Sequence, residues 1–193
     1  EDLYQEFMRD ITGEIDRENR IITDLLTLVK MDKKNADLQI QHMSINQLLE
    51  DILKRLRPIA DKRNIDLILD SFRPVEADVD ELKFTSAISN LVENAIKYNV
   101  DDGWVRVSLD ADHKFFYVTV ADSGMGIPED SLSRIFERFY RVDKSHSREI
   151  GGTGLGLAIT RSTIGMHHGV IKVFSKEGEG TTFSVRVPLS YIP

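Results

Sequence analysis

Residues 151–159 have the sequence Gly151-Gly152-Thr153-Gly154-Leu155-Gly156-Leu157-Ala158-Ile159, in which four glycines lead into an apolar helical pattern. Because glycine has no Cβ, these positions can adopt positive φ and let backbone N–H groups approach a ligand. The helix that follows directs the positive end of its dipole toward an anion. The stretch therefore predicts a phosphate-binding loop, although a flexible loop before a helix can have the same composition.

Several other nucleotide-binding motifs are missing from the sequence. There is no Gly-Lys-Ser or Gly-Lys-Thr, which excludes a P-loop, and no His-Arg-Asp or Asp-Phe-Gly, which excludes a eukaryotic-type protein kinase. A Rossmann fingerprint is expected early in a domain, between a strand and a helix. Here the glycines follow the polar segment 143–150, which contains Lys144, His146 and Arg148 and is typical of a mobile lid over a ligand.

Composition and charge limit the possible functions. With 193 residues, 41% of them hydrophobic, the chain can form one good core and a small appendage. The net charge of −7 argues against a nucleic-acid partner, which needs a basic surface. The lack of cysteine excludes disulfides, thiolate metal sites and a cysteine nucleophile. No apolar run approaches membrane-spanning length, so we expect no membrane contact by these residues.

The first 31 residues predict a long amphipathic helix. Its apolar residues are Leu3, Phe7, Ile11, Ile15, Ile22, Leu25, Leu26 and Val29, with charged residues between them and no proline. This heptad-like spacing favours a helical partner from another chain or from a truncated bundle. The alternative is a helix folded back on its own domain, although no downstream segment resembles a cover. We place the domain boundary here, with residues 1–34 separate from a compact domain at 35–193.

The compact domain begins with short strands and two amphipathic helices. A strand is expected near residues 38–40. Ser44 is the predicted N-cap of a helix that carries Ile45, Leu48, Leu49, Ile52, Leu53 and Leu56. Residues 65–69 and 77–79 predict two further strands, and Asp80 is expected to open the second helix.

The second helix has one apolar face and one polar face. Phe84, Ala87, Ile88, Leu91 and Ala95 share the apolar face, whereas the polar face carries Asn90, Glu93, Asn94 and Lys97. Asparagine is a poor helix former, so two of them in mid-helix indicate more than a solvated surface. Amide oxygens suit Mg²⁺, which takes few protein ligands and several phosphate oxygens, and Lys97 supplies a cation for the phosphates.

A predicted hairpin leads to the next candidate site residue. A turn at 101–103 leads into a strand at 105–109, and residues 116–120 form the matching antiparallel strand. Asp122-Ser123-Gly124-Met125-Gly126-Ile127 follows at once. An aspartate at a strand end can accept a hydrogen bond from the amine of adenine, and the glycines let a flat base lie against the backbone. An ordinary turn remains the alternative.

The rest of the chain predicts a loop, a helix and a closing hairpin. Residues 136–141, Phe-Glu-Arg-Phe-Tyr-Arg, hold three aromatics that cap an adenine pocket or pin a loop to the core. A short helical segment is expected before them, starting at Pro128 or Ser131. A helix at 155–166 follows the glycines, and strands near 171–173 and 183–187 form the hairpin.

These separated stretches resemble one family in order and spacing, the ATP-binding catalytic domain of bacterial sensor histidine kinases. The wider group includes gyrase B subunits, MutL and heat-shock chaperone ATPases. Residues 90–98 look like the N box, 122–127 the first glycine box and 136–141 the F box. Residues 152–157 and 178–183 resemble the second and third glycine boxes. The resemblance runs from about residue 37 to residue 193, and the leading helix resembles the second helix of the dimerisation and phosphoacceptor domain.

The resemblance implies a fold and a set of site residues. The fold is an α/β (α+β) two-layer sandwich, with a mixed, largely antiparallel sheet of about five strands, about three helices on one face and a long N-terminal helix. The implied cofactors are ATP and Mg²⁺. Asn94 is the implied metal ligand, Asp122 the adenine ligand, and Thr181 its support through water. The implied catalytic residues are Asn90, Lys97 and Arg141, and the other implied nucleotide contacts are Tyr98, Gly124, Gly126, Ile127, Phe139, Tyr140, Gly152, Thr153, Gly154, Leu155, Gly156 and Leu157.

Two departures from the family pattern bear on activity. The phosphoacceptor signature, a histidine followed by an acidic residue and a downstream proline, does not occur around any of His42, His113, His146, His167 and His168. We therefore expect the first dimerisation helix to be missing and this fragment alone not to autophosphorylate. The chain also has His167-His168-Gly169 where the family usually has His-Gly-Gly, and we interpret both histidines as structural.

The function implied by the resemblance is transfer of the ATP γ-phosphate to a histidine on a dimerisation helix, for relay to an aspartate of a response regulator receiver domain. The resemblance also implies a homodimer, and a cytoplasmic module of a protein anchored in the bacterial plasma membrane. A gyrase-like or chaperone-like ATPase and a non-catalytic nucleotide-binding module remain open. Related ATPases have Glu at the position of Asn90 to activate water, and Asn cannot act as a base, which favours transfer over hydrolysis. A role for Glu93 in hydrolysis would reverse this preference.

Overall fold

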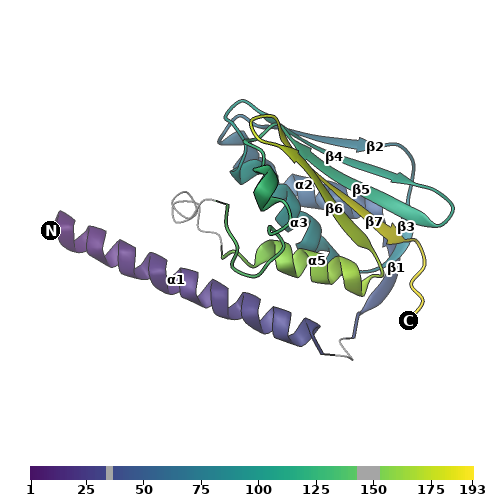
Figure 1. Cartoon of the computed structure of the whole chain (residues 1–193), viewed down its shortest axis with the longest axis horizontal. Coiled ribbons are helices and arrows are strands. Elements are labelled where there is room, and N and C mark those ends of the chain that lie inside the picture. Colours follow the sequence, from purple (N-terminus) through teal and green to yellow (C-terminus); the bar gives the residue numbers. More distant parts are fainter. Residues whose placement is uncertain (34–36, 143–152) are drawn as a thin grey trace.

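A computed structural model describes residues 1–33, 37–142 and 153–193. In these residues a five-stranded sheet has the order β2-β4-β5-β7-β6, with β2 and β4 parallel and the other neighbours antiparallel. Helices α2, α3 and α5 lie on one face of this sheet, and the long helix α1 lies beyond them (Figure 1). The predicted two-layer sandwich is confirmed.

The described elements follow the expected order along the chain. They are α1 (Asp2–Met31), β1 (Ile40–Ser44), α2 (Ile45–Asp61), β2 (Asp66–Ser71), β3 (Glu76–Asp80), α3 (Glu81–Lys97), β4 (Trp104–Ala111), β5 (Phe115–Asp122), η1 (Glu129–Ser131), α5 (Gly156–Met166), β6 (Val170–Lys176) and β7 (Gly180–Pro188). The short helical segment predicted at Pro128 or Ser131 is the three-residue 3₁₀ helix η1, and the predicted lid at 143–150 lies outside the described residues.

The sheet presents its alternating apolar side chains to the helical layer. Buried residues on β4, β5 and β7 occur at every second position, namely Val105, Val107, Leu109, Phe116, Val118, Val120, Phe183, Val185 and Val187. They pack in one core with the apolar faces of α2 and α3. At roughly 25 cal/mol for each Å² of apolar surface removed from water, this core supplies most of the stabilisation of the fold.

Helices α2 and α3 begin at the predicted caps. The Ser44 hydroxyl accepts a hydrogen bond from the Gln47 N–H at 3.3 Å, and the Asp80 carboxylate accepts one from the Lys83 N–H at 3.0 Å. Each cap satisfies one of the N–H groups that the first turn of a helix leaves without a partner. The start of α3 is therefore fixed, which sets the direction of its polar face.

Strands β1 and β3 form a separate two-stranded antiparallel sheet, a pairing that local sequence patterns did not predict. His167 connects this small sheet to α5. Its Nε2 accepts a hydrogen bond from the Asp80 N–H at 3.0 Å, and its Nδ1–H donates to the Thr163 carbonyl at 2.8 Å. Burial lowers the pKa of this imidazole, which favours the neutral form that these two bonds require. His167 therefore has the predicted structural role.

Helix α1 is covered only in part. Leu28 is 1% exposed and packs with Leu155 and Ala158 at the start of α5. Farther toward the N-terminus α1 extends away from the domain, and Leu3 and Phe7 are 81% and 62% exposed (Figure 1). The expectation that nothing downstream covers α1 is thus wrong for its C-terminal part, where α5 provides the cover. The exposed apolar residues Tyr4, Met8, Ile11, Ile15, Ile22 and Val29 form what we term the exposed α1 stripe.

Candidate functional site

A cavity of about 1030 Å³ lies between α3, the end of β5, the start of α5 and α1. Most of the predicted nucleotide-binding residues line it: Asn90, Asn94, Lys97, Tyr98, Asp122, Gly126, Ile127, Tyr140, Arg141, Thr153, Gly154, Gly156, Leu157 and Thr181. Gly124, Phe139 and Leu155 are not among the lining residues, and Gly152 lies outside the described residues. Segments far apart in the sequence therefore meet at one site.

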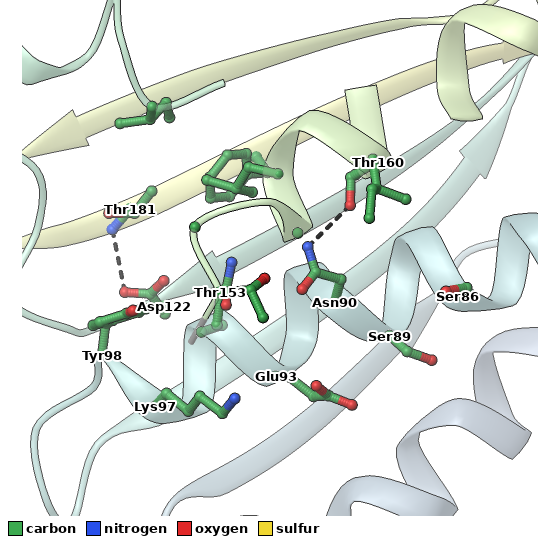
Figure 2. A pocket seen from close by; sticks show the side chains of 18 of the residues that line it. Ser86, Ser89, Asn90, Glu93, Lys97, Tyr98, Asp122, Thr153, Thr160 and Thr181 are labelled. Carbon is green, nitrogen blue, oxygen red and sulfur yellow. Dashed lines mark hydrogen bonds between the residues drawn. The ribbon is translucent and has the colours of Figure 1, made fainter. Parts of the chain in front are cut away.

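Asp122 has a half-buried carboxylate, and one of its two oxygens already accepts hydrogen bonds from the protein. Its Oδ1 accepts a hydrogen bond from the backbone N–H of Gly124 at 2.8 Å and another from the backbone N–H of Thr181 at 3.3 Å. Figure 2 shows the bond from Thr181. Thr181 stands directly opposite Asp122 in the β5–β7 register. Burial raises the pKa of the Asp122 carboxyl above its ordinary value. Among the described residues Oδ2 has no hydrogen-bond donor, so it can accept from a ligand in the cavity.

The polar face of α3 forms one wall of the cavity. Asn90, Glu93 and Lys97 lie on successive turns of this helix (Figure 2), and Asn94 also lines the cavity. The opposite face of α3 is buried in the core, which confirms the predicted division into two faces. Lys97 forms no ion pair within the described part of the chain, so its ammonium group is available to an anion.

Asn90 is fixed by α5. Its Nδ2 donates a hydrogen bond to the Thr160 hydroxyl at 3.0 Å (Figure 2), and a Cβ at Gly156 would lie 2.7 Å from Asn90 Oδ1. A side chain at position 156 would therefore displace the Asn90 amide, so glycine here keeps Asn90 in this position. No side chain among the described residues caps the N-terminus of α5, and Gly156 and Leu157 line the cavity. The first N–H groups of α5 can therefore serve an anionic ligand.

The loop after η1 is pinned to the core and to Gly154. Phe136 packs edge-to-face on Phe183 with ring centroids 6.3 Å apart, and the Tyr140 hydroxyl donates to Ser131 at 2.9 Å. Phe139 is 51% exposed, has a φ of +63° and donates its N–H to the Gly154 carbonyl at 2.9 Å. Two of the three aromatics thus anchor the loop, and this loop holds Arg141 at the cavity.

A family comparison agrees with this geometry. Residues 79–191 match the family model described as "Histidine kinase-, DNA gyrase B-, and HSP90-like ATPase". The chain belongs to this ATPase family. The match begins just before α3 and ends after β7, so it includes the parts of the cavity that come from α3, β5, α5 and β7, but not those that come from α1 and α2.

Relatives of this ATPase-family chain are sensor histidine kinases. Sensor histidine kinase WalK of Bacillus subtilis is 34% identical over 190 residues, covering 97% of this chain but 31% of that protein. The chain therefore spans about a third of the length of this relative. The catalytic domain of histidine kinase ThkA has a TM-score of 0.71 and 26% identity, covering 79% of this chain and 97% of that domain. ThkA in complex with response regulator protein TrrA shares the fold with a TM-score of 0.77 at 23% identity, covering 96% of this chain and 51% of that one.

The sequence did not predict that α1 contributes to the site. Arg20 and Asp24 of α1 line the cavity, and the Thr153 hydroxyl donates a hydrogen bond to the Asp24 carboxylate at 2.7 Å. The spacing of Arg20, Asp24 and Leu28 could have indicated this contact, because residues four apart lie on one face of a helix. That face differs from the exposed α1 stripe.

Asn94 has the chemistry of a magnesium ligand. The side-chain amide of Asn94 takes part in no hydrogen bond with the described residues, and Asn94 lines the cavity together with Lys97. No group of three His, Asp or Glu side chains suited to a metal occurs in residues 1–33, 37–142 and 153–193. A site with one protein oxygen and several phosphate oxygens fits Mg²⁺ better than a metal held by the protein alone.

In residues 1–33, 37–142 and 153–193, no helix combines the length and the apolarity that a membrane span needs.

Proposed function

We propose that this chain is the Mg-ATP-binding catalytic module of a sensor histidine kinase. The observation that carries the proposal is the convergence on one cavity of the Asp122 carboxylate, the polar face of α3 and the uncapped N-terminus of α5. A carboxylate, amides, cations and free N–H groups together match an adenine base joined to a triphosphate.

Each part of the nucleotide has a proposed ligand. Asp122 Oδ2 accepts a hydrogen bond from the adenine amine, while Gly124 and Thr181 hold the other oxygen in place. Guanine has a carbonyl where adenine has this amine, so Asp122 selects against GTP. The α5 N–H groups, Lys97, Tyr98 and Arg141 bind the phosphates.

Magnesium is the proposed second cofactor, with Asn94 as its protein ligand. When bound, Mg²⁺ neutralises charge that develops on the phosphate oxygens during transfer. The chain's own residues orient the nucleotide around it. Asn90, held by Thr160, lies beside the triphosphate and has no basic group with which to deprotonate water.

The proposed reaction is phosphoryl transfer to a histidine. An imidazole nitrogen attacks the γ-phosphorus, the bond from the γ-phosphorus to the bridging oxygen of ADP breaks, and ADP leaves. Lys97 and Arg141 stabilise the negative charge on the transferred group and on the leaving group. The imidazole is itself the nucleophile, so no general base of this chain is needed to activate it.

The proposed domain division is residues 1–34 as the second helix of a dimerisation and phosphoacceptor domain and 35–193 as the catalytic domain. The exposed α1 stripe supports this division, because its apolar residues recur at heptad-like intervals on a face away from α5. We propose that this stripe packs against a phosphoacceptor helix in a homodimer. The phosphohistidine then supplies a response regulator receiver domain, as part of a protein anchored in the bacterial plasma membrane.

One observation favours a second activity, slow ATP hydrolysis. Glu93 lines the cavity one turn from Asn90 and has a carboxylate that can accept a proton from water. Phosphate release that is abolished in Glu93→Gln and unaffected in Asn90→Ala would establish hydrolysis and contradict the assignment as a dedicated transferase.

Titration of the chain with ATP and with GTP, both with Mg²⁺, tests the proposed nucleotide site. We expect saturable ATP binding, no GTP binding at the same concentrations, and weaker ATP binding when Mg²⁺ is chelated. Equal binding of the two nucleotides would contradict the role of Asp122, and no binding of either would leave only a non-catalytic module.

A further inference from the structure

Cations from two parts of the chain meet at the cavity. Lys97 and Arg141 come from the catalytic domain, whereas Arg20 comes from α1. Arg17 lies one turn before Arg20. Burial lowers the pKa of the Arg141 guanidinium, and the nearby charge of Arg17 lowers it further. Arg17, Arg20 and Arg141 form what we term the arginine cluster.

The face of α1 that carries Arg17 and Arg20 is held against the domain by specific contacts. Leu28 is buried on α5. Asp24 accepts a hydrogen bond from Thr153 at 2.7 Å, and Asp32 forms an ion pair with Arg138 at 2.6 Å. With about 1.5 Å of rise per residue, Arg17 lies roughly 16 Å along the helix from Leu28. The arginines therefore belong to the docked face and lie beyond its apolar anchor.

Among the ion pairs of the described residues, the arginine cluster takes part in one. Arg17 has a side chain that is only 28% exposed, and its sole ion-pair partner among the described residues is Glu14 at 3.7 Å. The Arg17 Nε is buried without a hydrogen-bond partner in the described part of the chain. Leaving a buried charged donor unsatisfied is unfavourable, and guanidinium groups close together repel one another. An anion among them would remove both costs.

Asp24 and Glu93 are the acidic residues of α1 and α3 that line the cavity. Asp24 is hydrogen-bonded to Thr153, and Glu93 belongs to the α3 wall of the cavity. Arg55, a further cation at the cavity, already donates a hydrogen bond to Ser89 at 3.2 Å. Arg20 and Arg141 line the cavity, whereas Arg17 is close to Arg141 but is not among the lining residues. The arginine cluster, with two of its three members in the lining, is therefore suited to an additional phosphate.

The arrangement of the sheet, the helical layer and α1 indicates which phosphate of a bound nucleotide would reach the arginine cluster. Asp122 belongs to the sheet, whereas α1 lies on the other side of the helical layer (Figure 1). A nucleotide with its base at Asp122 and its phosphates at the start of α5 extends toward α1. The phosphate nearest to α1 is then the terminal one.

We propose that Arg17 and Arg20 of α1, together with Arg141, bind the γ-phosphate of ATP, so that the triphosphate site is shared between α1 and the catalytic domain. This inference rests on the proposed ATP-binding function and adds two binding residues outside the ATPase-family match. Its consequence is that docked α1 favours ATP over ADP, because ADP lacks the phosphate that the cluster binds. ATP in turn favours the docked position of α1, since the two equilibria are linked.

The test is the ratio of ADP to ATP dissociation constants, measured with Mg²⁺ on the full chain and on the variants Arg20→Gln, Arg17→Gln and Arg20→Lys. We expect Arg20→Gln to weaken ATP binding about 5- to 20-fold, as for loss of a charge-assisted bond to phosphate, with little change for ADP. Arg17→Gln should act in the same direction, and Arg20→Lys should restore much of the ATP preference. The matched control is Arg9→Gln, at an exposed arginine of the same helix, which should leave both constants unchanged.

The outcomes separate this inference from the proposed function. Wild-type binding of ATP with an unchanged ratio in Arg20→Gln and Arg17→Gln would overturn the shared site and leave the nucleotide site intact. Equal weakening of ATP and ADP would also overturn it, because the arginines would then act through the position of α1. Absence of ATP binding by the wild-type chain would instead refute the proposed function.

Discussion

Replacing Asp122 with asparagine isolates the contact proposed to recognise adenine. The Oδ1 atom of the new side chain can keep both backbone hydrogen bonds that Asp122 Oδ1 accepts from Gly124 and Thr181. The change removes the acceptor Oδ2 and presents an NH₂ donor to the adenine amine. A hydrogen bond to a charged group contributes about 1.5–3 kcal/mol, so the dissociation constant for ATP should rise by about 10- to 150-fold.

The thermal stability of Asp122→Asn should not fall, although its affinity for ATP does. Burial raises the pKa of Asp122, so its charged form is disfavoured in the folded state, and the stability that this group contributes declines as pH rises through its folded pKa. At neutral pH the amide that replaces the carboxylate carries no charge to desolvate. Asp122→Asn should therefore melt at the same temperature as the wild type or higher.

Calorimetric titration with Mg-ATP and thermal melting without nucleotide are the two assays for Asp122→Asn. Asp66→Asn, at an exposed carboxylate of β2, is the matched control and should leave ATP affinity unchanged. An ATP dissociation constant within about twofold of wild type, less than the loss of one hydrogen bond, would refute the role of Asp122 in adenine recognition. A lower melting temperature together with weaker binding would show that the carboxylate acts mainly in folding.

Three further perturbations test the fold around the site. Gly154→Val places a β-branched residue at a φ of +76° beside Phe139, at a cost of about 1–2 kcal/mol. The variant should bind ATP more weakly but still show a cooperative melting transition. Loss of the folded state would instead show that the loop has a structural role. Leu28→Ala should reduce α1 docking by about 2–3 kcal/mol and speed hydrogen exchange in the second half of α1 but not in the sheet; unchanged exchange would contradict the docking contact. Burial lowers the pKa of His167, so its neutral form contributes stability above the ordinary pKa of about 6.5, and this stability is lost as pH falls. The difference in unfolding free energy between wild type and His167→Gln should therefore be smaller at pH 5.5 than at pH 7.5, which lie roughly one unit on either side of that pKa. An equal difference at the two pH values would contradict this role of His167.

Local patterns were sufficient for the elements that build the nucleotide cavity. The alternation of β4 and β5, the Asp80 cap and the two faces of α3 each depend on residues close together in the sequence. Polar residues in mid-helix at 90 and 94 marked the wall of a site, because nothing in helix propensity explains them. Their proposed roles toward ATP remain predictions.

Long-range contacts could not be predicted in the same way. The antiparallel pairing of β1 with β3 depends on where α2 returns the chain, and neither strand carries a signal for its partner. The docking of Leu28 on α5 depends on Leu155 and Ala158, which follow it by more than 120 residues. The same distance explains why Arg20 and Asp24 were missed as cavity residues, since their spacing on α1 indicated a face but not its partner.

The proposed γ-phosphate contact of the arginine cluster would link nucleotide binding to the position of α1. Because Leu28 and Asp24 hold α1 beside the cavity, a change in the position of α1 would also move Arg17 and Arg20. Under this proposal, a change in the position of α1 alters nucleotide affinity, and nucleotide binding alters the position of α1 in turn.

The central claim is phosphoryl transfer from ATP bound in this cavity to a histidine, and transfer of labelled γ-phosphate tests it most directly. The chain is incubated with labelled Mg-ATP and a separately supplied phosphoacceptor helix able to pack on the exposed α1 stripe. We expect acid-labile label on the histidine of that helix, and loss of this label in Asp122→Asn at ATP concentrations below the variant's dissociation constant. Label recovered only as free phosphate, with the nucleotide bound and the helix docked, would contradict it.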